Sequence, residues 1–111
     1  DGLTFSGWWK DDGSGDWVRV FAVGTSGGDN ELVMSRQEGK SHIRFKGFRG
    51  AVNWPQVLLY NAWQTGVWQH FVWSFHRTSE YTSDWRIYLN GVLVSTTYDT
   101  MFPVDTEYPL N

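Results

Sequence analysis

The chain has 111 residues, few enough for one domain, and 41% of them are hydrophobic, including eight Trp, seven Phe and five Tyr. Its net charge of −3 argues against binding to nucleic acid or to an anionic membrane through bulk charge. No apolar run reaches the ~18 residues of a membrane span, and the absence of cysteine excludes disulfides and thiolate metal sites. We expect residues 1–111 to be a single domain and a fragment of a larger multidomain protein.

Short strands separated by turns rich in Gly, Ser and Asp are predicted along most of the chain. Alternating side chains and β-branched or aromatic residues predict strands at residues 3–10, 17–23, 31–36, 41–46, 57–60, 67–76, 83–89 and 92–97. No stretch shows the 3.6-residue period of an amphipathic helix. This pattern indicates an all-β protein, either an antiparallel sandwich or a barrel.

The dipeptide Asn90-Gly91 predicts a tight hairpin between the last two of these strands, because a type I′ turn needs positive φ at both central residues. The turn would place Leu89 opposite Val92, Tyr88 opposite Leu93 and Ile87 opposite Val94. Side chains alternate across a strand, so one face of the hairpin would be apolar and consist of Ile87, Leu89, Val92 and Val94. The other face would carry Arg86, Tyr88, Leu93 and Ser95.

Four motifs in order along the chain resemble those of laminin-G-like domains, a part of the concanavalin A-like lectin/glucanase group. They are residues 3–10, residues 19–24 together with 29–36, residues 68–75, and residues 86–94. The resemblance implies a jelly-roll sandwich of two curved antiparallel sheets with little or no helix. It also implies binding of carbohydrate or extracellular protein, at the cell surface or outside the cell. The family's terminal strands would lie before Asp1 and after Asn111.

Catalysis is not expected from the carboxylates of this chain. Glucanases with this fold carry a Glu-x-Asp-x-Glu strand, whose alternation places two carboxylates on one face, about 5–5.5 Å apart. Glu31, Glu38, Glu80 and Glu107 each lack a partner at the second position along. We therefore predict that the chain is not an enzyme.

Two acidic loops are candidates for a calcium site, because oxygen ligands on loops suit Ca²⁺. One loop holds Asp11, Asp12 and Asp16, and the other holds Asp29 and Asn30. The alternative is that these residues serve ordinary turn chemistry. Calcium is the single cofactor that the sequence suggests.

A basic stripe is the first candidate for ligand binding. Lys40, His42, Arg44 and Lys46 have the same parity, so they would share one face of an extended strand. Such a stripe suits a sulfated or carboxylated glycan. The alternative is a solvated outer face opposite Ile43 and Phe45.

Surplus aromatic residues are the second candidate, since aromatic rings stack on the apolar faces of sugars. Strand alternation points one set of residues toward the core, namely Phe5, Trp9, Phe71, Trp73, Phe75, Ile87 and Leu89. Trp8 and Tyr88 lie off this core parity, as do Trp54, Tyr60 and Trp63, and Arg86 shares the strand face of Tyr88. The alternative is that Trp8 and Tyr88 support each other across neighbouring strands, or pack under another segment. Trp68 and His70 are expected to serve packing.

The sequence as a whole favours a non-catalytic, lectin-like recognition module. Its partners would be a glycan, an extracellular or surface protein, or neighbouring domains of the same polypeptide, with no role for nucleic acid or membrane insertion. One alternative is a structural packing domain in a large surface or filament assembly. Another is the remnant of a glycoside hydrolase.

Overall fold

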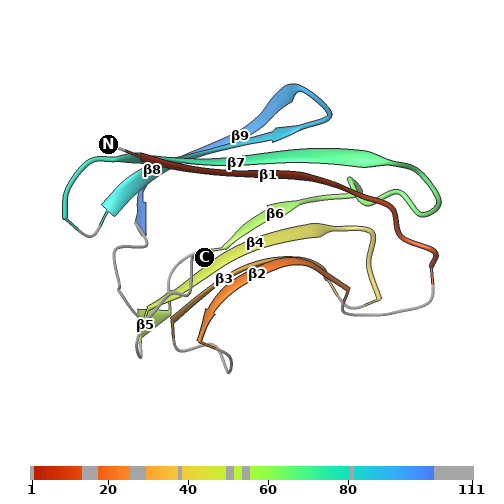
Figure 1. Cartoon of the computed structure of the whole chain (residues 1–111), viewed down its shortest axis with the longest axis horizontal. Coiled ribbons are helices and arrows are strands. Elements are labelled where there is room, and N and C mark those ends of the chain that lie inside the picture. The colour runs from red at the N-terminus through yellow and green to blue at the C-terminus, as the bar shows by residue number, and fades with distance from the viewer. Residues whose placement is uncertain are drawn as a thin grey trace. The chain divides into compact units, whose positions relative to one another are not determined.

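The computed structural model of the chain describes residues 2–13, 18–25, 30–37, 39–49, 52–53, 56–80 and 82–101 (Figure 1). Within these residues the secondary structure is entirely β, and no helix is present that could span a membrane. The strands are Gly2–Trp9 (β1), Arg19–Thr25 (β2), Asn30–Arg36 (β3), Ile43–Arg49 (β4), Val52–Asn53 (β5), Val57–Leu59 (β6), Gln69–Arg77 (β7), Thr82–Leu89 (β8) and Val92–Met101 (β9). The chain divides into two units, Asp1–Ser14 with Gln64–Phe102, and Gly15–Trp63 with Pro103–Asn111.

Unit 1 is built on an antiparallel sheet in the order β1-β7-β8-β9, with β7 lying between β1 and β8 (Figure 1). Its register places Phe5 opposite Trp73 and Trp73 opposite Ile87. Five large hydrophobic side chains of β7 and β8 are buried on one face of this sheet, namely Phe71, Trp73, Phe75, Trp85 and Ile87. The rings of Trp73 and Trp85 meet edge to face at 5.0 Å, a favourable geometry for aromatic pairs. The predicted core parity of β7 and β8 is therefore confirmed.

The Asn90-Gly91 hairpin forms as predicted, with φ of 52° at Asn90 and 83° at Gly91. Its first two pairs also match, because Leu89 lies opposite Val92 and Tyr88 opposite Leu93. The register then shifts.

Beyond this shift, Ile87 pairs with Ser95, so the prediction that it faces Val94 is wrong. A β-bulge inserts one extra residue into a strand and turns the following side chains over. Val92 and Val94 are exposed, and the predicted apolar face of the hairpin does not extend onto β9.

Unit 2 is built on a five-stranded antiparallel sheet in the order β2-β3-β4-β5, with β6 also pairing with β4. Phe21, Met34, Phe45 and Val57 form one row across β2, β3, β4 and β6. Four side chains of the central strands are fully buried, namely Leu32, Met34, Ile43 and Phe45. The all-β class with antiparallel sheets is thus confirmed, although β5 was not expected and β9 runs four residues past the predicted end.

Candidate functional site

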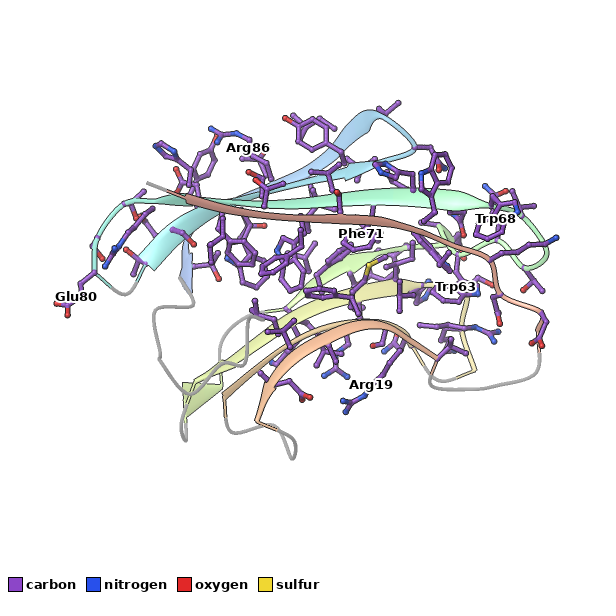
Figure 2. All side chains as sticks on the ribbon, in the orientation of Figure 1. Arg19, Trp63, Trp68, Phe71, Glu80 and Arg86 are labelled. Atoms are coloured by element: carbon purple, nitrogen blue, oxygen red, sulfur yellow. The ribbon has the colours of Figure 1, made fainter. Side chains whose placement is uncertain are left out.

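The second face of the unit 1 sheet carries side chains that are exposed or half-buried throughout. We call it the open face and define it by Thr4, Ser6, Trp8, His70, Val72, Ser74, Arg86, Tyr88, Leu93 and Thr96. Antiparallel pairing arranges these side chains in cross-strand rows. Figure 2 shows Arg86 and Phe71 on opposite sides of this sheet, so the buried aromatic face and the open face are distinct.

The first row of the open face holds an aromatic cluster. Trp8 lies directly opposite His70, and the two rings stand 4.8 Å apart at an interplanar angle of 52°. Trp68 directly precedes β7, at the end away from Glu80 (Figure 2). Trp8 is 66% exposed and Trp68 is 62% exposed, so both indoles present large apolar surfaces to solvent. We call Trp8, Trp68 and His70 the aromatic platform.

Asn90 fixes the platform to the hairpin. The backbone N–H of His70 donates to Asn90 Oδ1 at 2.9 Å, and the backbone N–H of Asn90 donates to the His70 carbonyl at 2.8 Å. These two bonds extend the hydrogen bonding between β7 and β8 by one residue pair, from the last paired residues to the turn residue Asn90. The backbone that carries the ring in contact with Trp8 is therefore bound to Asn90 through both its N–H and its carbonyl.

Tyr88 and Arg86 occupy the next two rows. Tyr88 is half-buried and lies opposite Val72 on β7. Because β7 separates β8 from β1, the prediction that Trp8 and Tyr88 support each other across neighbouring strands is wrong. Arg86 lies opposite Ser74. The predicted ligand residues Trp8, Tyr88 and Arg86 are thus brought onto one face.

Only two of the four residues of the predicted basic stripe lie on a strand. Lys40 and His42 precede β4, and Arg44 and Lys46 lie on it with the same parity, opposite Ser35 and Val33. Lys46 is only 8% exposed, so the alternative of a solvated outer face is wrong for this residue, whereas Arg44 is half-buried.

Burial also changes the acid–base behaviour of this part of unit 2. Burial lowers the pKa of the Lys46 ammonium, and the charge of Arg44 lowers it further. The pKa of the Arg44 guanidinium is lowered by burial and then by Arg19. Arg19 forms an ion pair with the buried Glu31 at 2.9 Å. Glu31 and Lys46 are thus buried in the sheet, whereas the Arg19 side chain is exposed.

His42 is engaged locally. Its Nδ1 accepts the backbone N–H of Asn61 at 3.0 Å, and its ring meets that of Tyr60 edge to face at 4.8 Å. Lys40 is exposed, and its carbonyl accepts Arg36 Nε. The four residues of the predicted stripe therefore have four different surroundings.

The acidic loops are described only in part. Asp11 is buried, its Oδ1 accepts the N–H of Gly13 at 3.1 Å, and its carbonyl accepts the N–H of Gly66 at 2.7 Å. This is turn chemistry, the alternative weighed against calcium. Asp12 is exposed, Asn30 starts β3, and Asp16 and Asp29 lie outside the described residues. Among the described residues no three His, Cys, Asp or Glu side chains are grouped as metal ligands.

The remaining aromatic candidates differ from one another. Tyr60 is exposed, whereas Trp63 is buried and belongs to the core, so its inclusion among the exposed aromatics is wrong. Trp54 lies outside the described residues. Trp68 was assigned to packing from the sequence, but it is exposed. Trp68 falls on the same alternating positions as His70 and Val72, which point away from the core. This alternation in the sequence could have indicated that Trp68 is exposed.

A hollow of about 400 Å³ lies at the β7–β8 turn and is lined by Arg77, Thr78, Ser79 and Glu80. Arg77 donates from Nε to the Ser79 carbonyl and from a terminal nitrogen to the Glu80 carbonyl. The hydroxyls of Thr78 and Ser79 both bond to the hydroxyl of Thr82. These groups hold the turn together, so the hollow is the weaker candidate for a site.

Comparison with protein families gave one result. A family model described as the concanavalin A-like lectin/glucanases superfamily matches residues 1–111. Comparison with curated proteins and with solved structures found no match.

Proposed function

Because the chain belongs to the concanavalin A-like lectin/glucanases superfamily, we propose that it is a non-catalytic recognition module that binds carbohydrate on the open face of unit 1. The observation that carries the proposal is the exposed indole of Trp8 against the His70 ring, with a second exposed indole, Trp68, just before β7. Trp8 and Trp68 each leave more than 60% of their surface accessible. An exposed aromatic surface beside polar groups is suited to the apolar faces of sugar rings.

The arrangement of acids supports a binding role over hydrolysis. A retaining glycosidase needs two carboxylates about 5–5.5 Å apart, one of them free to act as an acid. Glu31 is committed to Arg19, and Asp84 accepts the backbone N–H of Asp99 through Oδ1. On the open face of unit 1 the groups that converge are aromatic, hydroxyl and cationic. We place such a module outside the cell or at the cell surface.

The test is binding of the intact chain to a panel of neutral and acidic polysaccharides. Trp8→Ala is expected to weaken binding about tenfold or more, which corresponds to about 1.4 kcal/mol. Tyr60→Ala is the matched control, because Tyr60 is equally exposed but lies in unit 2. Equal losses in both variants, or no polysaccharide bound by the unaltered chain, would refute the proposal.

Removal of calcium by a chelator tests whether binding takes place on the open face or at the acidic loops. The open face offers no cluster of oxygen ligands among its described side chains, so binding is expected to be unchanged by a chelator. Binding that needs added Ca²⁺ would move the site to the loops that carry Asp11 and Asp12.

A second candidate function is contact with a protein partner, favoured by the hairpin tip. Val92, Leu93 and Val94 are consecutive and all exposed. An apolar tip of this kind suits a neighbouring domain or a surface assembly. Replacing Val92 and Val94 by Thr would then weaken association with that partner and leave polysaccharide binding intact.

A further inference from the structure

Arg86 differs from the other arginines whose side chains the structure describes. Arg19 pairs with Glu31, Arg36 donates to the Lys40 carbonyl, and Arg77 donates to two carbonyls of its own turn. Arg86 is half-buried on the open face, yet its guanidinium has no hydrogen bond or ion pair with any described residue. A guanidinium carries five donors in a planar fork, and a partly desolvated one gains most from an anionic acceptor.

Hydroxyl groups flank Arg86 on both sides. Ser74 on β7 and Thr96 on β9 are its cross-strand partners, so their Cβ atoms lie about 4.5–5.5 Å from that of Arg86. Thr4 on β1 continues the row and its hydroxyl reaches that of Ser74 at 3.5 Å. The row across the four strands is therefore a cation set among neutral hydroxyls, which can donate to the same acceptor.

The nearest acid on this face does not neutralise Arg86. Asp84 lies two residues earlier on β8 with the same parity, and its Oδ1 accepts the N–H of Asp99 at 3.1 Å. Within the described structure Asp84 and Arg86 form no ion pair. The chain as a whole carries a net charge of −3, so attraction of an anion to this face is local rather than a bulk effect.

The aromatic platform lies two rows from Arg86 on the same face. Rows on one face of a strand are two residues apart, or about 6.6–6.8 Å, so the two features are separated by about 13 Å. Tyr88 and Val72 fill the row between them. A ligand touching both ends would be longer than one sugar ring, with its apolar surface on the indoles and a negative group at Arg86.

From this juxtaposition we infer that the open face binds an acidic carbohydrate, whose carboxylate is held by Arg86 between Ser74 and Thr96. The inference rests on the proposed function, since it specifies the sugar class for the same face. A carboxylate fits because its two oxygens match the guanidinium fork in a bidentate pair.

The experiment uses uronic-acid polysaccharides and the same polymers with their carboxyl groups methyl-esterified, so that only the charge differs. Polygalacturonate, alginate and hyaluronan, each against its ester, are titrated into the intact chain. At least one polyuronate is expected to bind about tenfold or more tightly than its ester. Arg86→Gln is expected to abolish that preference, so that each polyuronate binds no more tightly than its ester.

Two further variants make the result specific. Arg36→Gln removes the same charge from unit 2 and is expected to keep the preference. Arg86→Lys keeps the charge without the fork, so an intermediate preference is expected. Thermal unfolding of each variant establishes that it is folded.

The outcomes distinguish the inference from the proposed function. Equal binding of ester and polyuronate, or a preference that survives Arg86→Gln, overturns the inference and leaves the proposed function standing. Binding of sulfated polymers without binding of any polyuronate also overturns it. Failure of every polymer, charged or neutral, overturns both.

Discussion

At the scale of single residues, one side-chain type serves two opposite purposes in unit 1. Trp85 is completely buried and meets Trp73 and Phe75 edge to face, whereas Trp8 is mostly exposed and touches His70. Burial of an aromatic side chain stabilises a fold by removing apolar area from water. An exposed indole contributes little to stability, which leaves it available for a ligand.

Trp85→Ala is therefore expected to lower the free energy of unfolding by about 3–5 kcal/mol, because it removes a large buried side chain and leaves a cavity. Trp8→Ala is expected to cost less than about 1 kcal/mol. Urea denaturation of the two variants measures both values. Comparable losses would show that Trp8 is part of the packed core.

Lys46 gives a prediction with a pH dependence. Its pKa in the folded chain is lowered by burial and by Arg44, so it lies below that in the unfolded chain. Between these two values unfolding takes up a proton, and stability therefore rises with pH. At neutral pH the ammonium is charged in both states, and its surroundings in the folded chain disfavour that charge.

Lys46→Met is expected to raise the free energy of unfolding by about 1 kcal/mol at neutral pH, since Glu31 keeps its pair with Arg19. The gain should shrink as the pH rises toward the ordinary pKa of lysine. Denaturation of both proteins across the alkaline range measures this. A loss of stability at neutral pH would show that the Lys46 charge is stabilising, and a pH-independent difference would show that its pKa is not lowered in the folded chain.

At the scale of elements, the β8–β9 hairpin links folding to the site. Its turn residues adopt positive φ, and Asn90 binds the His70 backbone at two points. The hairpin thus ends the β7–β8 ladder where the aromatic platform begins. A change in the turn should be felt in both stability and ligand binding.

Asn90→Ala is expected to cost about 1–2 kcal/mol of stability, because it removes the acceptor of the His70 N–H and replaces a residue that tolerates positive φ with one that does so less well. It should also weaken polysaccharide binding by loosening His70. Asn90→Asp keeps an oxygen acceptor and the tolerance of positive φ, and should restore both properties. If Asn90→Ala lost stability alone, the platform would not depend on this link.

Local patterns account for what was predictable at this scale. Alternation assigned Trp73 and Phe75 to the buried face, and Asn90-Gly91 located the turn, because both signals are contained within a few residues. The bulge after Leu93 was missed, since it depends on pairing with β8 rather than on the sequence of β9. Burial of Lys46 was missed for a similar reason. Strand alternation predicts the face of the sheet on which a side chain lies, but not which other residues cover that face. The parity of Trp68 was informative, but its residue type suggested the core.

At the scale of the whole molecule, the two units carry surfaces of different character. Unit 1 presents aromatic, hydroxyl and cationic side chains on one exposed face, whereas the charges described on the β3–β4 strands of unit 2 are largely packed in. The family model spans both units, and the superfamily includes lectins and glucanases. Among the described residues, the exposed face of unit 1 is the surface that best fits a lectin-like role.

The most direct test of this account is nuclear magnetic resonance of the ¹⁵N-labelled intact chain during titration with a polyuronate oligosaccharide. The indole N–H of each Trp gives its own signal, so exposed and buried indoles report separately. We predict saturable shifts for Trp8 and Trp68, and little change for Trp73 and Trp85. Shifts confined to other residues, or no shifts with any carbohydrate, would contradict the assignment of the open face as the binding surface.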